Sequence, residues 1–250
     1  MKALITGASS GIGKDIAIEL SNLGYDLILV SKDLGKLTKV KEEIKTKARV
    51  IATDLSIKDN CIKLYTDLKN EDIDILVNNA GFGKFGEFND IDLDKEIDMI
   101  NVNLITPHVL TKLFLKDMIK KDSGSILNVA SSAAFLPGPL MATYYATKSY
   151  LYKLSLAIYQ ELKVKKSNVK ISVLCPGPVK TNFNNVADVS FSIKGLDSKY
   201  VAKYTIKKVF KNKLIIIPGF NIRLVVFLSK FIPIKLLLKI NYNIQRRKGN

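Results

Sequence analysis

Cysteine and histidine are scarce in this sequence, and each shortage excludes a class of site. The two cysteines, Cys61 and Cys175, are too few for a disulfide framework and lack metal-ligand spacing. The single histidine, His108, excludes a multi-histidine metal site and would have to be the base of any serine-histidine hydrolase. We therefore expect no bound metal. Because no secretory leader precedes the cysteines, we expect a reducing, cytoplasmic setting.

The sequence also lacks a long uninterrupted apolar run. Residues 218–250 form an apolar and basic C-terminal tail, and the apolar stretch from Leu214 to Ile240 is interrupted repeatedly. The interrupting residues are Pro218, Arg223, Lys230, Pro233, Lys235 and Lys239. A membrane-spanning helix needs about 20 mostly apolar residues, so the tail is not expected to be one.

Peripheral attachment of this tail to a membrane is a weaker alternative. Its apolar side chains, together with nearby lysines, could meet an anionic lipid surface. The candidate side chains are Leu224, Val225, Phe227, Leu228 and Phe231. A role in lining a substrate pocket or a subunit contact is favoured over membrane contact.

Acidic residues are few beside the basic ones: 23 against 39, for a formal net charge of +16. Such a charge attracts phosphates, polyanions and anionic lipid heads. The lysines are spread along the whole chain, however, and no aromatic platform for stacking bases is visible. This pattern favours solvated surface lysine over nucleic-acid binding.

Short β-rich runs alternate with amphipathic segments along the chain. The predicted strands are Lys2–Thr6, Asp26–Val30, Arg49–Ala52, Ile73–Val77, Ser125–Ala130, Val169–Leu174 and Lys213–Ile217. The predicted helices are Gly11–Leu23, Asp33–Lys47, Lys58–Lys69, Leu93–Lys121 and Ala142–Lys165. This alternation predicts an α/β fold: a doubly wound (Rossmann-type), mostly parallel seven-stranded sheet with helices on both faces.

The length of 250 residues favours a single domain spanning residues 1–250. Residues 181–212, which are richer in polar side chains, are expected to form a cover over the substrate. In open parallel sheets, ligands bind beyond the carboxyl ends of the strands, where the strand order reverses. The segments expected at that edge are Thr6-Gly7, Asp54-Leu55, Asn78-Asn79-Ala80-Gly81, Ser131 and Pro176-Gly177.

A glycine-rich turn follows the first predicted strand. Gly7, Gly11 and Gly13 allow a tight turn, close approach of a pyrophosphate and close packing of the next helix. Ser9 and Ser10 add hydroxyl donors to this turn. Because strand, turn and amphipathic helix occur in the required order, the sequence predicts a dinucleotide site.

The end of the second strand bears on which nicotinamide cofactor binds. Ser31 and Lys32 can donate to a 2′-phosphate, whereas Asp33 lies where an NAD-type acid could bind the ribose hydroxyls. Asp33 directly precedes a periodic apolar run, so we interpret it as a helix N-cap and favour NADP(H) over NAD(H). Asp54 is a candidate acceptor for the adenine amine, and the pair Ala80-Gly81 allows backbone to lie flat near the adenosine.

Tyr144 and Lys148 carry the strongest chemical signal. Residues four apart share a helix face, so Tyr144 points where Lys148 points, whereas Tyr145 shares its face with Ser149. A nearby ammonium favours the phenolate and lowers the pKa of a tyrosine from about 10, which suits acid–base chemistry in a redox enzyme. Ser131 and Ser132 end the preceding strand pattern, and strand alternation predicts that only one of them faces the site.

Together these residues resemble the short-chain dehydrogenase/reductase family, through about Thr181. The motifs that match are Thr6-Gly7-Ala8-Ser9-Ser10-Gly11-Ile12-Gly13, Asp54-Leu55, Asn78-Asn79-Ala80-Gly81 and Pro176-Gly177-Pro178-Val179-Lys180-Thr181. The resemblance implies that Ile12, Leu55, Asn79, Pro176, Gly177, Val179 and Thr181 contact the cofactor. It also implies a catalytic trio of Ser131, Tyr144 and Lys148, with Ser131 chosen by its 13-residue spacing from Tyr144, and Asn103 as the active-site asparagine.

The implied reaction is hydride transfer between NADP(H) and a ketone, aldehyde or acyl-type carbonyl, or the corresponding alcohol. Tyr144 would protonate the carbonyl oxygen, Ser131 would hydrogen-bond it, and Lys148 would hold the cofactor ribose. Asn103 would complete a proton path through water. Related enzymes are usually dimers or tetramers, so a homo-oligomer is expected. The alternatives are a catalytically silent NADP-binding regulator, or the same enzyme attached peripherally to membranes through its tail.

Overall fold

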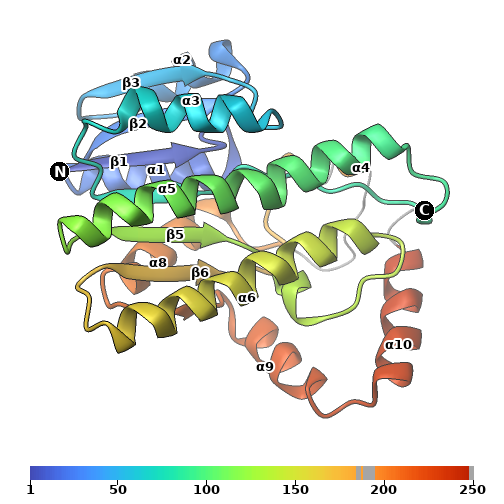
Figure 1. The fold of residues 1–250 in the computed structure, drawn as a ribbon. Helices are drawn as coiled ribbons and strands as arrows, with labels where there is room; N and C mark the ends of the chain where they lie inside the picture. Colours follow the sequence, from blue (N-terminus) through green and yellow to red (C-terminus); the bar gives the residue numbers. More distant parts are fainter. Residues whose placement is uncertain (184–186, 188–194, 248–250) are drawn as a thin grey trace.

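The computed structural model describes residues 1–183, 187 and 195–247, and within them the chain forms one parallel sheet (Figure 1). The strand order is β3-β2-β1-β4-β5-β6-β7, and every neighbouring pair is parallel. The strands are β1 Lys2–Thr6, β2 Asp26–Ser31, β3 Ala48–Ala52, β4 Ile75–Asn78, β5 Ser125–Val129, β6 Lys170–Leu174 and β7 Ile215–Ile216. Strand order reverses between β1 and β4, so the predicted doubly wound sheet is confirmed.

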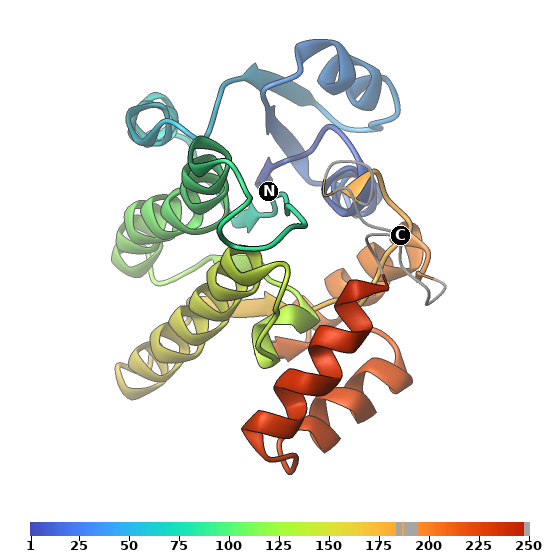
Figure 2. The same ribbon diagram turned by 90° about the vertical axis from the view of Figure 1, so that its right-hand side faces the viewer.

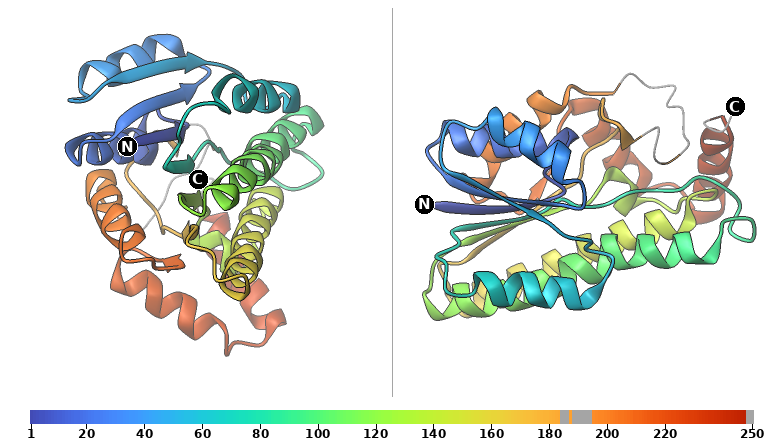
Figure 3. Two further views of the ribbon diagram at one scale, coloured as in Figure 1. Left: turned by 60° about the vertical axis from the view of Figure 1, so that its left-hand side comes forward. Right: turned by 90° about the horizontal axis from the view of Figure 1, so that it is seen from above.

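Helices cover both faces of the sheet, as the view from above makes clear (Figure 3, right). The α-helices are α1 Gly11–Asn22, α2 Leu34–Glu42, α3 Lys58–Leu68, α4 Leu93–Ile100, α5 Thr106–Lys120, α6 Ala142–Val164, α8 Ser198–Val209, α9 Phe220–Ser229 and α10 Ile234–Arg246. A π-helical segment, η1, spans Asn101–Ile105, and a 3₁₀ segment, η2, spans Ser132–Phe135.

Successive residues of a strand point alternately into two apolar layers, one on each face of the sheet. Ile5 and Leu29 point into the layer shared with α1, α2 and α8, whereas Leu4 and Ile28 point into the layer shared with α3, α5 and α6. These side chains are almost fully buried. A strand buried on both faces needs a continuous apolar run, which explains why the strands could be found in the sequence.

Two predicted helices differ from the observed ones. The helix predicted over Leu93–Lys121 is interrupted by η1, and the one predicted over Asp33–Lys47 ends at Glu42. The second ends early because the Ser21 hydroxyl accepts hydrogen bonds from the backbone N–H groups of Lys45 and Thr46. That tertiary contact holds the segment outside the helix.

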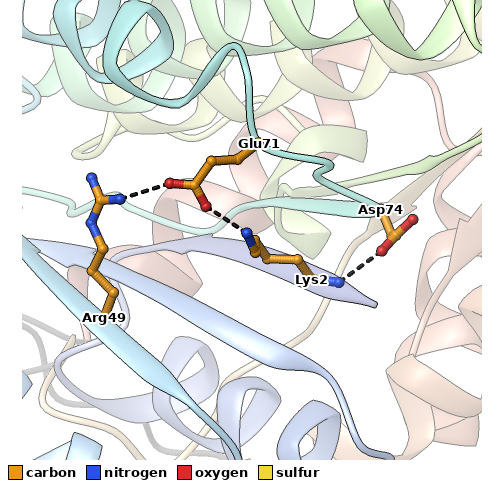
Figure 4. Close-up of polar contacts among 4 residues, drawn as sticks. All are labelled: Lys2, Arg49, Glu71 and Asp74. Carbon is orange, nitrogen blue, oxygen red and sulfur yellow. Dashed lines mark hydrogen bonds and ion pairs between the residues drawn. The ribbon is translucent and has the colours of Figure 1, made fainter.

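A polar cluster links β1, β3 and β4 at their amino ends (Figure 4). This edge of the sheet lies opposite the carboxyl ends of the strands, where the site residues were predicted. Glu71 accepts from Lys2 Nζ at 2.6 Å and from Arg49 Nη1 at 2.7 Å. The backbone N–H of Lys2 donates to Asp74 Oδ2 at 2.7 Å. The hydrogen bond from Lys2 is the main cause that lowers the pKa of Glu71, and the charges of Lys2 and Arg49 add to it.

We expect Glu71→Gln to destabilise the protein by about 0.5–1 kcal/mol at pH 7, because two cations lose their shared carboxylate. A depressed pKa in the folded state means that this stabilisation is present above the ordinary pKa of glutamate and is lost as the pH falls through the folded value. Urea unfolding at pH 7 and pH 3 measures it. The difference from wild type should be smaller at pH 3 than at pH 7, and exposed Glu42→Gln serves as the control.

Candidate active site

The turn after β1 packs directly against the turn after β4. The Thr6 hydroxyl accepts from the backbone N–H groups of Asn79 (3.0 Å) and Ala80 (3.1 Å), and Asn79 Nδ2 donates to the Gly7 carbonyl (3.0 Å). Gly7 has φ +64°, and a Cβ there would lie 2.8 Å from Ala80 Cα. Only glycine fits this position. The first glycine of the motif therefore allows the two turns to pack against each other.

A cavity of about 1170 Å³ extends from this turn across the carboxyl ends of the strands. Almost every predicted site residue lies on its wall: Gly7, Ser9, Ser10, Gly11, Ile12, Ser31, Lys32, Asp54, Leu55, Asn79, Ala80, Gly81, Ser131, Tyr144, Lys148, Pro176, Gly177, Val179 and Thr181. Two predicted residues, Gly13 and Asn103, stand behind the described wall. Gly13 packs against the Asn79 amide and the Gly7 carbonyl, too close to leave room for a Cβ.

The end of the cavity near β2 carries charges of both signs, with Lys32 and Lys36 beside Asp33 and Asp54. Ser31 Oγ donates to Ser9 Oγ at 2.9 Å, and Lys32 and Lys36 both line the wall. The Asp33 carboxylate accepts from the Lys36 backbone N–H at 2.9 Å and pairs with Lys36 Nζ at 3.1 Å. The prediction that Asp33 is a helix N-cap is therefore confirmed. The backbone hydrogen bond from Lys36 is the main cause that lowers the pKa of Asp33.

The loop after β3 forms another part of this wall. Asp54 Oδ1 accepts from the Ser56 backbone N–H at 2.9 Å, and this bond is the main cause of a lowered pKa for Asp54. Asp54 is thus held ionised on the cavity wall, where it can accept a hydrogen bond. Leu55 is held by its carbonyl, which accepts from Thr106 Oγ1.

Asn103 lies in the middle of the π-helical segment and is completely buried. Its Nδ2 donates to the Phe82 carbonyl (2.8 Å) and to Thr147 Oγ1 (3.2 Å), while its Oδ1 accepts from the Phe82 N–H (3.0 Å). A Cβ on Gly81 would meet both Asn103 Oδ1 and Lys148 Nζ, so these two polar groups are neighbours across that glycine. The extra residue per turn of a π-helix allows this orientation.

Tyr144, Lys148 and Ser131 come together on the cavity wall. Lys148 Nζ lies 5.9 Å from the centre of the Tyr144 ring and donates to the Val129 carbonyl at 3.1 Å. Ser131 follows β5, accepts from the Ala133 N–H at 3.1 Å and forms a hydrogen bond with the Tyr144 side chain. The strand ends at Val129, so strand alternation does not govern the two serines. Ser132 also borders the cavity, so the choice of Ser131 over Ser132 stays a prediction.

The titration of this group differs from the sequence-based expectation. Burial raises the pKa of Tyr144 to about 12, and the hydrogen bond with Ser131 opposes that rise only in part. Burial also lowers the pKa of Lys148 to about 8. The net pKa of Tyr144 is therefore raised and not lowered, because its removal from water dominates.

The loop after β6 closes over the glycine turn. A Cβ on Gly11 would lie 3.0 Å from Thr181 Cγ2, so the segment that holds Pro176, Gly177 and Val179 ends beside the start of α1. Val179 forms a parallel bridge with Leu196. Residues 184–186 and 188–194 of the predicted cover lie outside the described residues.

The family model described as short chain dehydrogenase matches residues 1–189. The chain therefore belongs to the short-chain dehydrogenase family. Human very-long-chain 3-oxoacyl-CoA reductase is 39% identical to it over 171 residues, which are 65% of this chain and 55% of that protein. The chain therefore aligns with little more than half of that relative's length.

Solved structures agree with this membership. A metagenomic short-chain oxidoreductase in complex with NADP is 29% identical, with a TM-score of 0.74 over 88% of this chain and 98% of that one. The bulky-bulky ketone specific alcohol dehydrogenase from Comamonas testosteroni is 28% identical, with a TM-score of 0.78 over 88% of this chain and 86% of the other.

This short-chain dehydrogenase also builds its cavity from residues that the sequence analysis missed. They are Lys36, Phe82, Val102, Tyr145, Ile222, Asn241, Ile244 and Gln245. The last four come from α9 and α10, which lie beside the cavity although they end the chain. Asn241 Nδ2 donates to the Pro137 carbonyl at 2.8 Å, and Gln245 donates to the Tyr145 hydroxyl. The sequence favoured a pocket-lining or subunit-contact role for the apolar tail in general. A further signal was the i, i+4 spacing of Leu237, Asn241 and Gln245, which form the buried stripe of α10.

Proposed function

We propose that this protein is an oxidoreductase that transfers a hydride between NADP(H) and a ketone, aldehyde or acyl-type carbonyl, or the matching alcohol. The observation that carries the proposal is one cavity with the glycine turn on one part of its wall and Tyr144, Lys148 and Ser131 on another. Membership of the short-chain dehydrogenase family supports it.

The residues suggest how reduction proceeds. A bound nicotinamide supplies the hydride. Tyr144, whose pKa of about 12 keeps its hydroxyl protonated at neutral pH, donates its proton to the carbonyl oxygen. Ser131, already hydrogen-bonded to Tyr144, donates to the same oxygen and stabilises its developing negative charge. Lys148 places a cation below the Tyr144 ring, where it favours the phenolate left after proton transfer.

Asn103 is proposed as a positioning residue. It holds the backbone of Phe82 through both amide atoms and lies beside Lys148 across Gly81. In this position it can hold the Phe82 part of the cavity wall in place relative to Lys148. It can also support the return of a proton to Lys148 through water.

We further propose NADP(H) as the preferred cofactor. The Asp33 carboxylate is engaged by the start of α2, so it is poorly available to bind ribose hydroxyls. Ser31, Lys32 and Lys36 leave donors and positive charge at that end of the cavity, which suits a 2′-phosphate. The NADP complex of the metagenomic relative is in keeping with this choice.

The double variant Lys32→Ala/Lys36→Ala tests the cofactor choice. We expect the dissociation constant for NADPH to rise about tenfold or more, since two charge-assisted contacts to the 2′-phosphate are lost. Affinity for NADH, which has no such phosphate, should change little. Cofactor fluorescence titration measures both, and exposed Lys39→Ala on the same helix is the matched control. Equal losses for the two cofactors would contradict the assignment.

NADPH consumption with a panel of ketones, aldehydes and acyl thioesters tests the activity. Turnover of at least one carbonyl class is expected. Cofactor binding without any turnover across the panel would instead identify a regulator that senses the cofactor.

The finer organisation is also proposed. We propose that residues 1–250 act as one catalytic unit and that residues 181–212 cover the substrate, which the contact of Thr181 with the glycine turn and the bridge from Val179 to Leu196 support. A homodimer or homotetramer remains a prediction from the family resemblance.

A further inference from the structure

Helices α9 and α10 form a C-terminal hairpin (residues 220–246) at one end of the molecule (Figures 1 and 2). On α9 and the turn after it, large apolar side chains recur at helical spacing and share one face. This apolar stripe consists of Phe220, Leu224, Phe227, Leu228 and Phe231. All five are between 44% and 72% exposed. Phe227 and Phe231 pack edge to face with their rings 5.3 Å apart, so the stripe is continuous at its far end.

The charge of this part of the chain is extreme. Residues 198–250 contain 13 of the 39 basic residues and none of the 23 acidic ones. Residues 198–250 therefore carry +13 of the net charge of +16. Arg223 on α9 and Lys230, which directly follows α9, are exposed beside the apolar stripe, and Lys235 and Lys239 are exposed on α10.

We infer that the C-terminal hairpin docks on the surface of an anionic lipid bilayer, with the apolar stripe in the interface and the basic residues on lipid head groups. An apolar helix face flanked by basic residues is what such a surface binds. A second copy of the chain fits poorly, since it would bring two strongly basic, acid-free surfaces together. None of the helices over the described residues combines enough length with enough apolar character to cross a bilayer, so the contact is peripheral.

Docking would also place the cavity at the lipid surface. Ile222 and Val225 of α9 line the cavity, and they are neighbours of the stripe residues in the same helix. Ile244 of α10 adds a further apolar contact to this wall. Resting on the proposed function, this arrangement implies that carbonyl substrates with long apolar chains reach Tyr144 from the bilayer.

Flotation of the full chain with vesicles, without substrate or cofactor, tests the docking. Wild type should bind vesicles of phosphatidylcholine with 30 mol% phosphatidylglycerol and bind pure phosphatidylcholine at least tenfold more weakly. Phe227→Ser/Phe231→Ser should lose at least tenfold in binding, because two inserted aromatic side chains are removed. Ile57→Ser/Val164→Ser, which changes two exposed apolar residues far from the hairpin in sequence, is the matched control and should bind like wild type.

A charge series completes the test. Lys230→Gln/Lys235→Gln/Lys239→Gln should weaken binding to the anionic vesicles at least tenfold, and 0.5 M salt should weaken wild-type binding in the same way. Lys112→Gln/Lys116→Gln/Lys153→Gln removes the same charge from α5 and α6 and should have little effect.

The idea is overturned if wild type does not float with anionic vesicles, if both charge variants bind equally, or if sedimentation shows a stable dimer that Phe227→Ser/Phe231→Ser dissociates. Vesicle binding is measured without substrate or cofactor, whereas NADPH oxidation with water-soluble carbonyls is measured without vesicles. Failure of the docking and failure of the proposed reaction are therefore told apart.

Discussion

Tyr144→Phe is expected to lower kcat for carbonyl reduction by about 10²–10⁴-fold, the usual contribution of a positioned general acid. The change removes one oxygen and leaves the buried ring, its packing on Phe183 and its contact with Lys148 in place. Steady-state kinetics with NADPH and a verified carbonyl measures the loss. The affinity for NADPH should stay within a few fold of wild type.

Tyr145→Phe is the matched control, since it makes the same change at the next residue. Tyr145 also lines the cavity, but its hydroxyl is engaged away from the trio, where it accepts from Gln245 on α10. Its effect on kcat should be less than tenfold. If Tyr144→Phe kept normal turnover, or if Tyr145→Phe caused the larger loss, the proposed roles would have to be abandoned.

Lys148→Met is expected to abolish measurable turnover while making the ligand-free protein more stable at neutral pH. Lys148 is almost completely buried, with the Val129 carbonyl as its recorded hydrogen-bond acceptor. Burial lowers its pKa from 10.5 to about 8, which means that folding disfavours its charged form. Removing the charge should therefore raise the free energy of unfolding by about 1–3 kcal/mol at pH 7.

The pH dependence of this gain has a definite sign. Below pH 8 the lysine is charged in both the folded and the unfolded chain, so the full cost of burying the charge is present. Between pH 8 and about 10.5 the folded protein releases the proton first, and the cost disappears. The gain from Lys148→Met should accordingly be largest below pH 8 and small at pH 10.5 in urea titrations. Exposed Lys153→Met is the control, and a destabilised Lys148→Met protein at pH 7 would contradict the argument.

Much of the fold could be predicted because fully buried parallel strands leave a strong pattern. Ile28 and Leu29 face opposite layers yet both must be apolar, so β2 appears in the sequence as an unbroken apolar run. The turns after the strands were predictable for the same reason, since their glycine and polar residues follow such runs directly. Asn103, a poor helix former, indicated a distortion of the Leu93–Lys121 helix only as one of two alternatives. The form of the interruption was not predictable, because Asn103 is held by bonds to Phe82 and Thr147, which are distant in sequence.

The amino-acid sequence by itself determined which residues could carry chemistry and which strand ends would present them: Tyr144 and Lys148 one turn apart, and glycines where a backbone must approach another. Local spacing and side-chain type are enough for that. Only the tertiary structure decided the burial that sets the pKa values of Tyr144 and Lys148, and the return of α9 and α10 to the cavity. Desolvation and long-range packing depend on every element that surrounds a group, and no local pattern records them.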